Sequence, residues 1–178
     1  MDINLLDKNT LKIKLKKTNF VVDPKEKTPK TSADAIIALD RESFDATRVA
    51  DYRIIIKGPG EYEIGGIKLI GYKYDNEFTS YSFITGNISV LVGKVSSLEK
   101  ILDKIDEHKI AILDVDAKMN PSIVTAIEPN CLVLYGEMVK EGLESLGKEA
   151  LERKTEQSQK LTINEDKLSE EMQIIILE

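Results

Sequence analysis

The chain has 178 residues, with 25 Lys and Arg against 31 Asp and Glu, so its formal net charge is −6. At 42% hydrophobic and 31% charged residues, this composition is typical of a globular domain with its own core and excludes disordered and fibrous classes. The acidic balance also disfavours nucleic-acid binding, which depends on Lys and Arg, and no apolar run approaches the roughly 20 residues of a membrane helix.

The single cysteine, Cys131, excludes an internal disulfide and lies in an apolar run, where we expect it to be a small core residue. The N-terminus lacks the charged and then apolar pattern of a secretory signal. We therefore expect a single domain over residues 1–178 in a reducing, cytoplasmic compartment.

The first half of the chain is rich in predicted strands. Short runs of apolar and β-branched residues bounded by turn residues predict strands at 11–15, 20–23, 35–39, 53–57, 64–72, 80–85 and 88–92. Gly86-Asn87 predicts a hairpin turn between the last two strands. Gly58-Pro59-Gly60 predicts a tight turn of type II that redirects the chain.

The first of these strands carries a run of lysines. Lys12, Lys14 and Lys16 alternate with apolar residues, and Lys17 follows them. Because side chains alternate between the two faces of a strand, the pattern predicts a solvated face on an edge strand.

After residue 92 the pattern changes to helices between strands. Apolar residues at three- and four-residue spacing predict helices near 98–105, 121–127 and 138–146, and apolar runs predict strands at 110–115, 131–134 and 172–177. Asn120-Pro121 is a typical start for the second helix. The alternation of strands and helices implies a partly parallel sheet.

One segment resembles a known family nearly letter for letter. Gly58-Pro59-Gly60-Glu61-Tyr62-Glu63 is similar to a segment of the metallo-β-lactamase superfamily, in its short branch of ascorbate-6-phosphate lactonase-like proteins and predicted zinc hydrolases. Weaker similarities follow the family order at 22–24, 33–37, 79–84, 88–93 and 127–133, so that the likeness covers about 11–136. The resemblance implies an α/β fold, namely an αββα four-layer sandwich.

The family's chemistry depends on a His-x-His-x-Asp-His loop, further histidines and a bridging Asp, which together hold one or two metal ions. By the resemblance, the loop here reads Asp40-Arg41-Glu42-Ser43-Phe44-Asp45, Lys94 stands at the bridging Asp, and the last histidine falls near Tyr135-Gly136. The one histidine, His108, lies elsewhere, and we expect it partly exposed at a helix C-terminus. We therefore expect no metal centre, no cofactor and no catalytic residue.

A carboxylate metal site is the alternative. Asp40, Glu42, Asp45, Asp114 and Asp116 are oxygen donors, which suit Mg²⁺, Ca²⁺ or Mn²⁺ better than Zn²⁺. Such a site would make the protein a divergent hydrolase of lactones or phosphoesters. Arg41 and Lys94 count against it, because both add positive charge to the same region.

The leading hypothesis is a catalytically inactive protein with this fold, since a fold carries no activity by itself. We expect it to act as an interaction or structural module, as a homo-oligomer or as the partner of another protein. Binding to nucleic acid or membrane is not expected.

Overall fold

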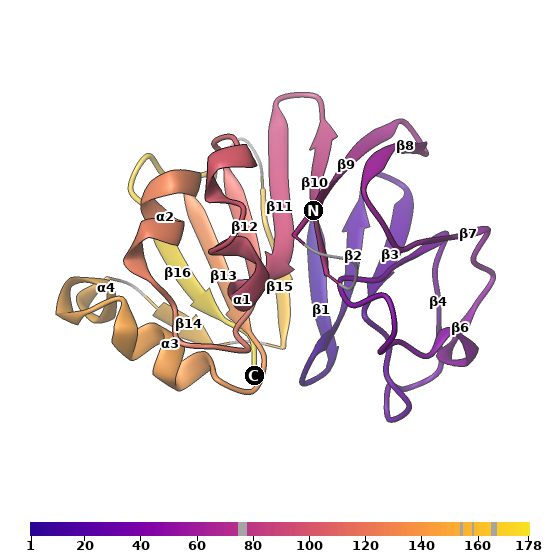
Figure 1. Cartoon of the computed structure of the whole chain (residues 1–178), viewed down its shortest axis with the longest axis horizontal. Coiled ribbons are helices and arrows are strands. Elements are labelled where there is room, and N and C mark those ends of the chain that lie inside the picture. Colours follow the sequence, from indigo (N-terminus) through magenta and orange to yellow (C-terminus); the bar gives the residue numbers. More distant parts are fainter. Residues whose placement is uncertain (75–77, 154, 158, 165–166) are drawn as a thin grey trace.

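The structure is a computed structural model that describes residues 1–74, 78–153, 155–157, 159–164 and 167–178. Over these residues two large β-sheets pack face to face, a small two-stranded sheet accompanies them, and the helices gather on one side (Figure 1). No helix in the described part of the chain is long and apolar enough to cross a membrane.

Among the described residues, one sheet has six strands and the other has eight. The six-stranded sheet has the order β15 (Lys160–Thr162), β1 (Asp2–Asp7), β2 (Thr10–Leu15), β3 (Thr18–Val22), β5 (Ala35–Ile37), β7 (Ile54–Ile56). The eight-stranded sheet has the order β14 (Thr155–Gln157), β16 (Gln173–Ile176), β13 (Cys131–Tyr135), β12 (Ile110–Asp114), β11 (Ile88–Lys94), β10 (Thr79–Thr85), β9 (Ile67–Lys73), β8 (Gly60–Ile64).

The main core lies between the two sheets. Strand β2 shows how it forms, because Leu11, Ile13 and Leu15 alternate along the strand and all three are buried. Across the core, the rings of Phe20 on β3 and Phe83 on β10 meet edge to face with centroids 5.1 Å apart. This contact joins one sheet to the other.

The outer face of the eight-stranded sheet packs against the helices, which are α1 (Val95–Leu98), η2 (Leu102–Lys104), α2 (Pro121–Ile127), α3 (Val139–Ser145) and α4 (Lys148–Glu152). Strands β11, β12, β13 and β16 run parallel, as the alternation of strands and helices predicts. Because β12 and β13 are covered on both faces, all of their residues are buried.

The outer face of the six-stranded sheet has a different cover. It packs against the segment with β4 (Thr31–Ser32), the 3-10 turn η1 (Ala46–Arg48) and β6 (Val49–Ala50), through Val21, Ile36 and Val49. The fourth layer of the sandwich is therefore made by this segment, which contains no α-helix.

Several local predictions are confirmed. The turn Gly86-Asn87 joins β10 to β11 as a hairpin, with Gly86 at φ 57°. Helix α2 spans the predicted residues, and the side chain of Asn120 accepts the N–H of Ser122 at 3.0 Å. Cys131 is buried, and burial raises the pKa of its thiol to about 11.

Three local predictions are wrong. Strand β2 is not an edge strand, because β1 and β3 pair with its two sides, although its lysines do lie on the outer face. The expected strand 64–72 is interrupted at Gly65-Gly66, where two positive φ values turn β8 into β9. The expected helix 98–105 is replaced by the shorter α1 and by η2.

Candidate functional site

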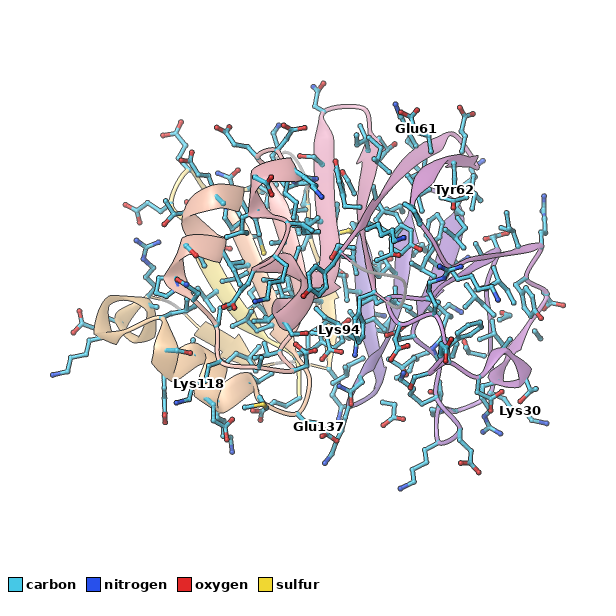
Figure 2. All side chains as sticks on the ribbon, viewed as in Figure 1. Lys30, Glu61, Tyr62, Lys94, Lys118 and Glu137 are labelled. Carbon is cyan, nitrogen blue, oxygen red and sulfur yellow. The ribbon has the colours of Figure 1, made fainter. Side chains whose placement is uncertain are left out.

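The candidate site lies where the carboxyl ends of several strands meet. Lys94 ends β11, Asp114 ends β12 and Tyr135 ends β13, and the parallel register places the three residues side by side. Asp23 follows β3 of the other sheet. Figure 2 places Lys94 near the centre of the molecule, between the helix-covered sheet and strands β1 and β2. The site therefore draws residues from both sheets.

Asp114 is paired in two directions. Its Oδ2 lies 3.5 Å from the Nζ of Lys94, and its Oδ1 accepts a hydrogen bond from the Nδ2 of Asn9 at 3.1 Å. The two side chains of the ion pair are 1% and 14% exposed, for Asp114 and Lys94 respectively. Asn9 belongs to the turn between β1 and β2, so its bond to Asp114 connects the two sheets.

Burial and charge act against each other in this pair. Burial raises the pKa of the Asp114 carboxyl, and the positive charge of Lys94 only partly offsets this effect. For Lys94, burial lowers the pKa, but the carboxylates of Asp114 and Asp23, with more distant acids, raise it above its ordinary value. Lys94 is therefore a firmly held cation.

Asp23 is the second buried carboxylate. Its Oδ1 accepts the N–H of Leu39 at 2.6 Å, while its Oδ2 has no hydrogen-bond partner within the described residues. Burial raises the pKa of Asp23 to about 6, although Lys25, Lys94 and the backbone donors act in the opposite direction. An unpartnered buried oxygen makes the charged form costly.

Tyr135 completes the buried group. Its side chain is inaccessible to solvent, and its hydroxyl has no hydrogen-bond partner in the part of the chain that the structure describes. Burial, followed by the negative charges of Asp114, Asp23 and Asp116, raises its pKa well above the ordinary value. The phenol is therefore neutral at physiological pH.

The predicted metal loop borders this group but, among the described residues, supplies no ligand set to it. Oδ1 of Asp40 accepts the N–H groups of Glu42 and Ser43 at 3.0 and 3.1 Å, while the side chain of Glu42 is exposed. Asp45 caps η1 by accepting the N–H and hydroxyl of Thr47, which lowers its pKa. Asp40 and Asp45 thus stabilise the loop itself.

Asp116 is the fifth candidate ligand. Its two oxygens accept the N–H and the hydroxyl of Ser96 at 3.0 and 2.6 Å, which ties the end of β12 to the start of α1. Over the described residues, no group of three or more His, Cys, Asp or Glu side chains is placed to hold a metal ion. With Lys94 among the carboxylates, the residues present do not fit the metal centre that the resemblance implies.

His108 contradicts its prediction. It is 3% exposed, with Nε2 at 2.7 Å from the hydroxyl of Ser82 and Nδ1 at 2.6 Å from the carbonyl oxygen of Asp106. The expected exposed position is wrong because His108 packs beside β10, while its backbone N–H donates to the carbonyl of Ile127 at the end of α2. No local sequence signal identifies Ser82 or Asn9, since each depends on a partner distant in the chain.

No protein-family profile and no curated protein sequence matches the chain. Among solved structures, it is similar to a Thermotoga maritima protein described as a Zn-dependent hydrolase of the metallo-β-lactamase superfamily, with TM-score 0.76, 16% identity and coverage of 99% of this chain and 97% of that one. The metallo-β-lactamase fold protein YhfI from Bacillus subtilis matches with TM-score 0.64 and 10% identity over 99% and 95% of the two chains.

A third similar structure is an isothiocyanate hydrolase from Delia radicum gut bacteria, with TM-score 0.58, 13% identity and coverage of 99% and 96%. Together these structures show that the chain has the metallo-β-lactamase fold, as the segment at Gly58–Glu63 indicates. Identities this low show the fold alone.

Proposed function

We propose that this protein is a non-hydrolytic version of the metallo-β-lactamase fold that acts by binding another protein. The observation that carries the proposal is the state of the predicted metal loop. Oδ1 of Asp40 and Oδ1 of Asp45 each accept backbone N–H groups of the residues that follow them, and Glu42 is exposed. Metal-dependent hydrolysis needs several ligands that converge and leave one position open for an activated water.

The experiment is metal analysis combined with a hydrolase assay. We expect the purified protein to contain no stoichiometric Zn, Mn or Fe, and to leave a phosphodiester and a lactone uncleaved with Zn²⁺, Mn²⁺ or Mg²⁺ added. The Asp40→Ala, Glu42→Ala double variant is the control. Stoichiometric metal, together with turnover that this double variant loses, would establish the divergent hydrolase instead.

The free edge of β7 is the surface that favours a partner. Strand β7 ends the six-stranded sheet, and no described strand pairs with its outer side. Ile54 on this strand and Tyr52 just before it are 40% and 37% exposed. An accessible edge with apolar side chains is a template for an added strand.

The charges beside this edge indicate the occupant. Arg53 and Lys57 flank β7, and both are exposed. Two copies of β7 paired antiparallel about Ile55 would place Arg53 opposite Lys57, and like charges directly opposite each other are unfavourable. An extended segment of a different protein, with acidic residues at its ends, complements both cations.

A labelled peptide of alternating Val and Thr with Glu at both ends tests this surface by fluorescence anisotropy. We expect salt-sensitive binding that Ile54→Lys or Arg53→Glu abolishes and that the control Tyr74→Ser, which changes another exposed aromatic residue, leaves intact. A peptide with Lys ends should bind weakly. Equal binding of both peptides would refute the acidic partner, and a dimer in light scattering that Ile54→Lys dissociates would assign the edge to a second copy.

A further inference from the structure

We propose that the ammonium group of Lys94 serves as a built-in cation, which compensates the buried carboxylate of Asp114 and keeps divalent metal ions out. Lys94 stands where the resemblance places a bridging Asp, so a positive charge has replaced a metal ligand.

The position of Lys94 supports this role. It ends β11 opposite Asp114 in the parallel register, and its Nζ lies 3.5 Å from Oδ2 of that residue. With 14% of its side chain exposed, Lys94 is held inside the protein rather than on the surface. The four methylene groups of its stem let the ammonium reach the buried carboxylate. The positive charge there therefore comes from the chain itself and not from an ion in solution.

The buried oxygens show why a cation is needed there. Oδ2 of Asp23 and Oδ2 of Asp114 are both buried and have no hydrogen bond within the described residues. Two uncompensated anions in this environment would strongly destabilise the fold. Lys94 lowers the pKa of both carboxyls, although its effect on Asp23 comes after that of Lys25, which also contacts the carbonyl and hydroxyl of Ser43.

The same charge opposes a divalent ion. A metal ion bound to Asp114 or Asp23 would lie close to the ammonium, and two cations at such a distance inside a protein repel strongly. The repulsion disappears when Lys94 is neutral. Removing the charge should therefore expose the carboxylates to metal ions from solution, the hard cations Mn²⁺ and Mg²⁺ above all.

The experiment compares Lys94→Gln with the wild type and with Lys100→Gln, which removes a lysine that is exposed. Melting is followed by circular dichroism in EDTA and then in ~2 mM MnCl₂ or MgCl₂. We expect Lys94→Gln to melt lower by at least about 5 °C in EDTA and to recover at least about 3 °C with Mn²⁺. The wild type and Lys100→Gln should not shift with either ion.

Two outcomes would overturn the proposal. One is a Lys94→Gln protein as stable as the wild type, and the other is a destabilised Lys94→Gln protein that neither ion stabilises. If Lys94→Gln does not fold in EDTA, Lys94→Gln with Asp114→Asn should fold, because this double variant removes both charges of the pair. An unfolded double variant would equally refute the role of Lys94. This role is a property of the isolated chain, so the experiment does not depend on whether the protein hydrolyses a substrate or binds a partner.

Discussion

The hydroxyl of Ser82 and the Nε2 of His108 lie 2.7 Å apart inside the protein, where both side chains are at most 3% exposed. The other ring nitrogen lies 2.6 Å from the carbonyl oxygen of Asp106. A carbonyl can only accept, so Nδ1 carries a proton, and in the neutral ring Nε2 accepts from Ser82. Burial favours this neutral form of the imidazole, because it lowers the pKa of His108.

This geometry predicts a loss of stability in acid. Burial lowers the pKa of His108, and the backbone and charge of Asp106 only partly offset it. Since the folded pKa lies below the ordinary 6.5, the unfolded chain takes up the proton first, and stability falls as the pH drops below about 6.5. Urea unfolding of the wild type and His108→Gln between pH 8 and 5 should show the variant losing less stability over that range. If the free energy of unfolding fell equally with pH in the wild type and in His108→Gln, the proposed neutral state of the buried His108 would be contradicted.

Asp23 predicts a pH dependence of the opposite sign. Its pKa is raised from 3.8 to about 6, so the folded state binds the proton more tightly than the unfolded state. The unfavourable contribution of the charged form is fully present above pH 6 and disappears as the pH falls toward 3.8. Asp23→Asn keeps an oxygen for the N–H of Leu39 and should stabilise the protein at pH 7.5, by at most about 3 kcal/mol.

The measurement for Asp23→Asn is the free energy of unfolding at pH 7.5 and 4.5. We expect the gain over the wild type to shrink at the lower pH. Asp45→Asn is the matched control, because hydrogen bonds from Thr47 lower the pKa of Asp45, so its substitution should destabilise at pH 7.5. A gain for Asp23→Asn that is equal at both pH values would exclude the titration of Asp23 as its cause.

Tyr81 anchors the turn Gly58-Pro59-Gly60. Its buried hydroxyl accepts the N–H of Gly58 at 2.8 Å, and Tyr81→Phe would leave that N–H without this partner. We expect a loss of about 1–2 kcal/mol in chemical unfolding. Tyr62→Phe is the comparison, since the Tyr62 hydroxyl donates to the carbonyl of the same Gly58 from a half-buried position and should matter less. Equal losses would mean that the burial of Tyr81 is not what makes its hydrogen bond important.

Gly136 leaves room for Asp114. It adopts φ 107°, and a Cβ placed there would collide with Oδ1 of Asp114. Gly136→Ala should therefore displace the carboxylate from Asn9 and Lys94 and cost roughly 2–4 kcal/mol. Gly147→Ala is the control, because Gly147 has a similar φ of 86° with open space around it and should lose only about 1 kcal/mol. Similar losses in thermal unfolding would show that backbone strain, and not the collision, is responsible.

Local sequence patterns were sufficient to predict much of the fold. The hairpin at Gly86-Asn87 and the helix that begins at Pro121 depend on neighbouring residues, so their signals are local. The resemblance at Gly58–Glu63 identified the fold that the similar structures show. The sequence also showed that the chain has a single histidine, because the count of a residue type needs no structure.

Only the tertiary structure decided which side chains meet. Strand β1 was not predicted, because its polar and apolar residues have no regular pattern and its partners are β2 and the distant β15. His108 is buried by packing against β10, and Lys94 meets Asp114 because two strands lie parallel. Such contacts arise from the pairing of segments far apart in the chain, where loop closure brings together residues that share no local spacing.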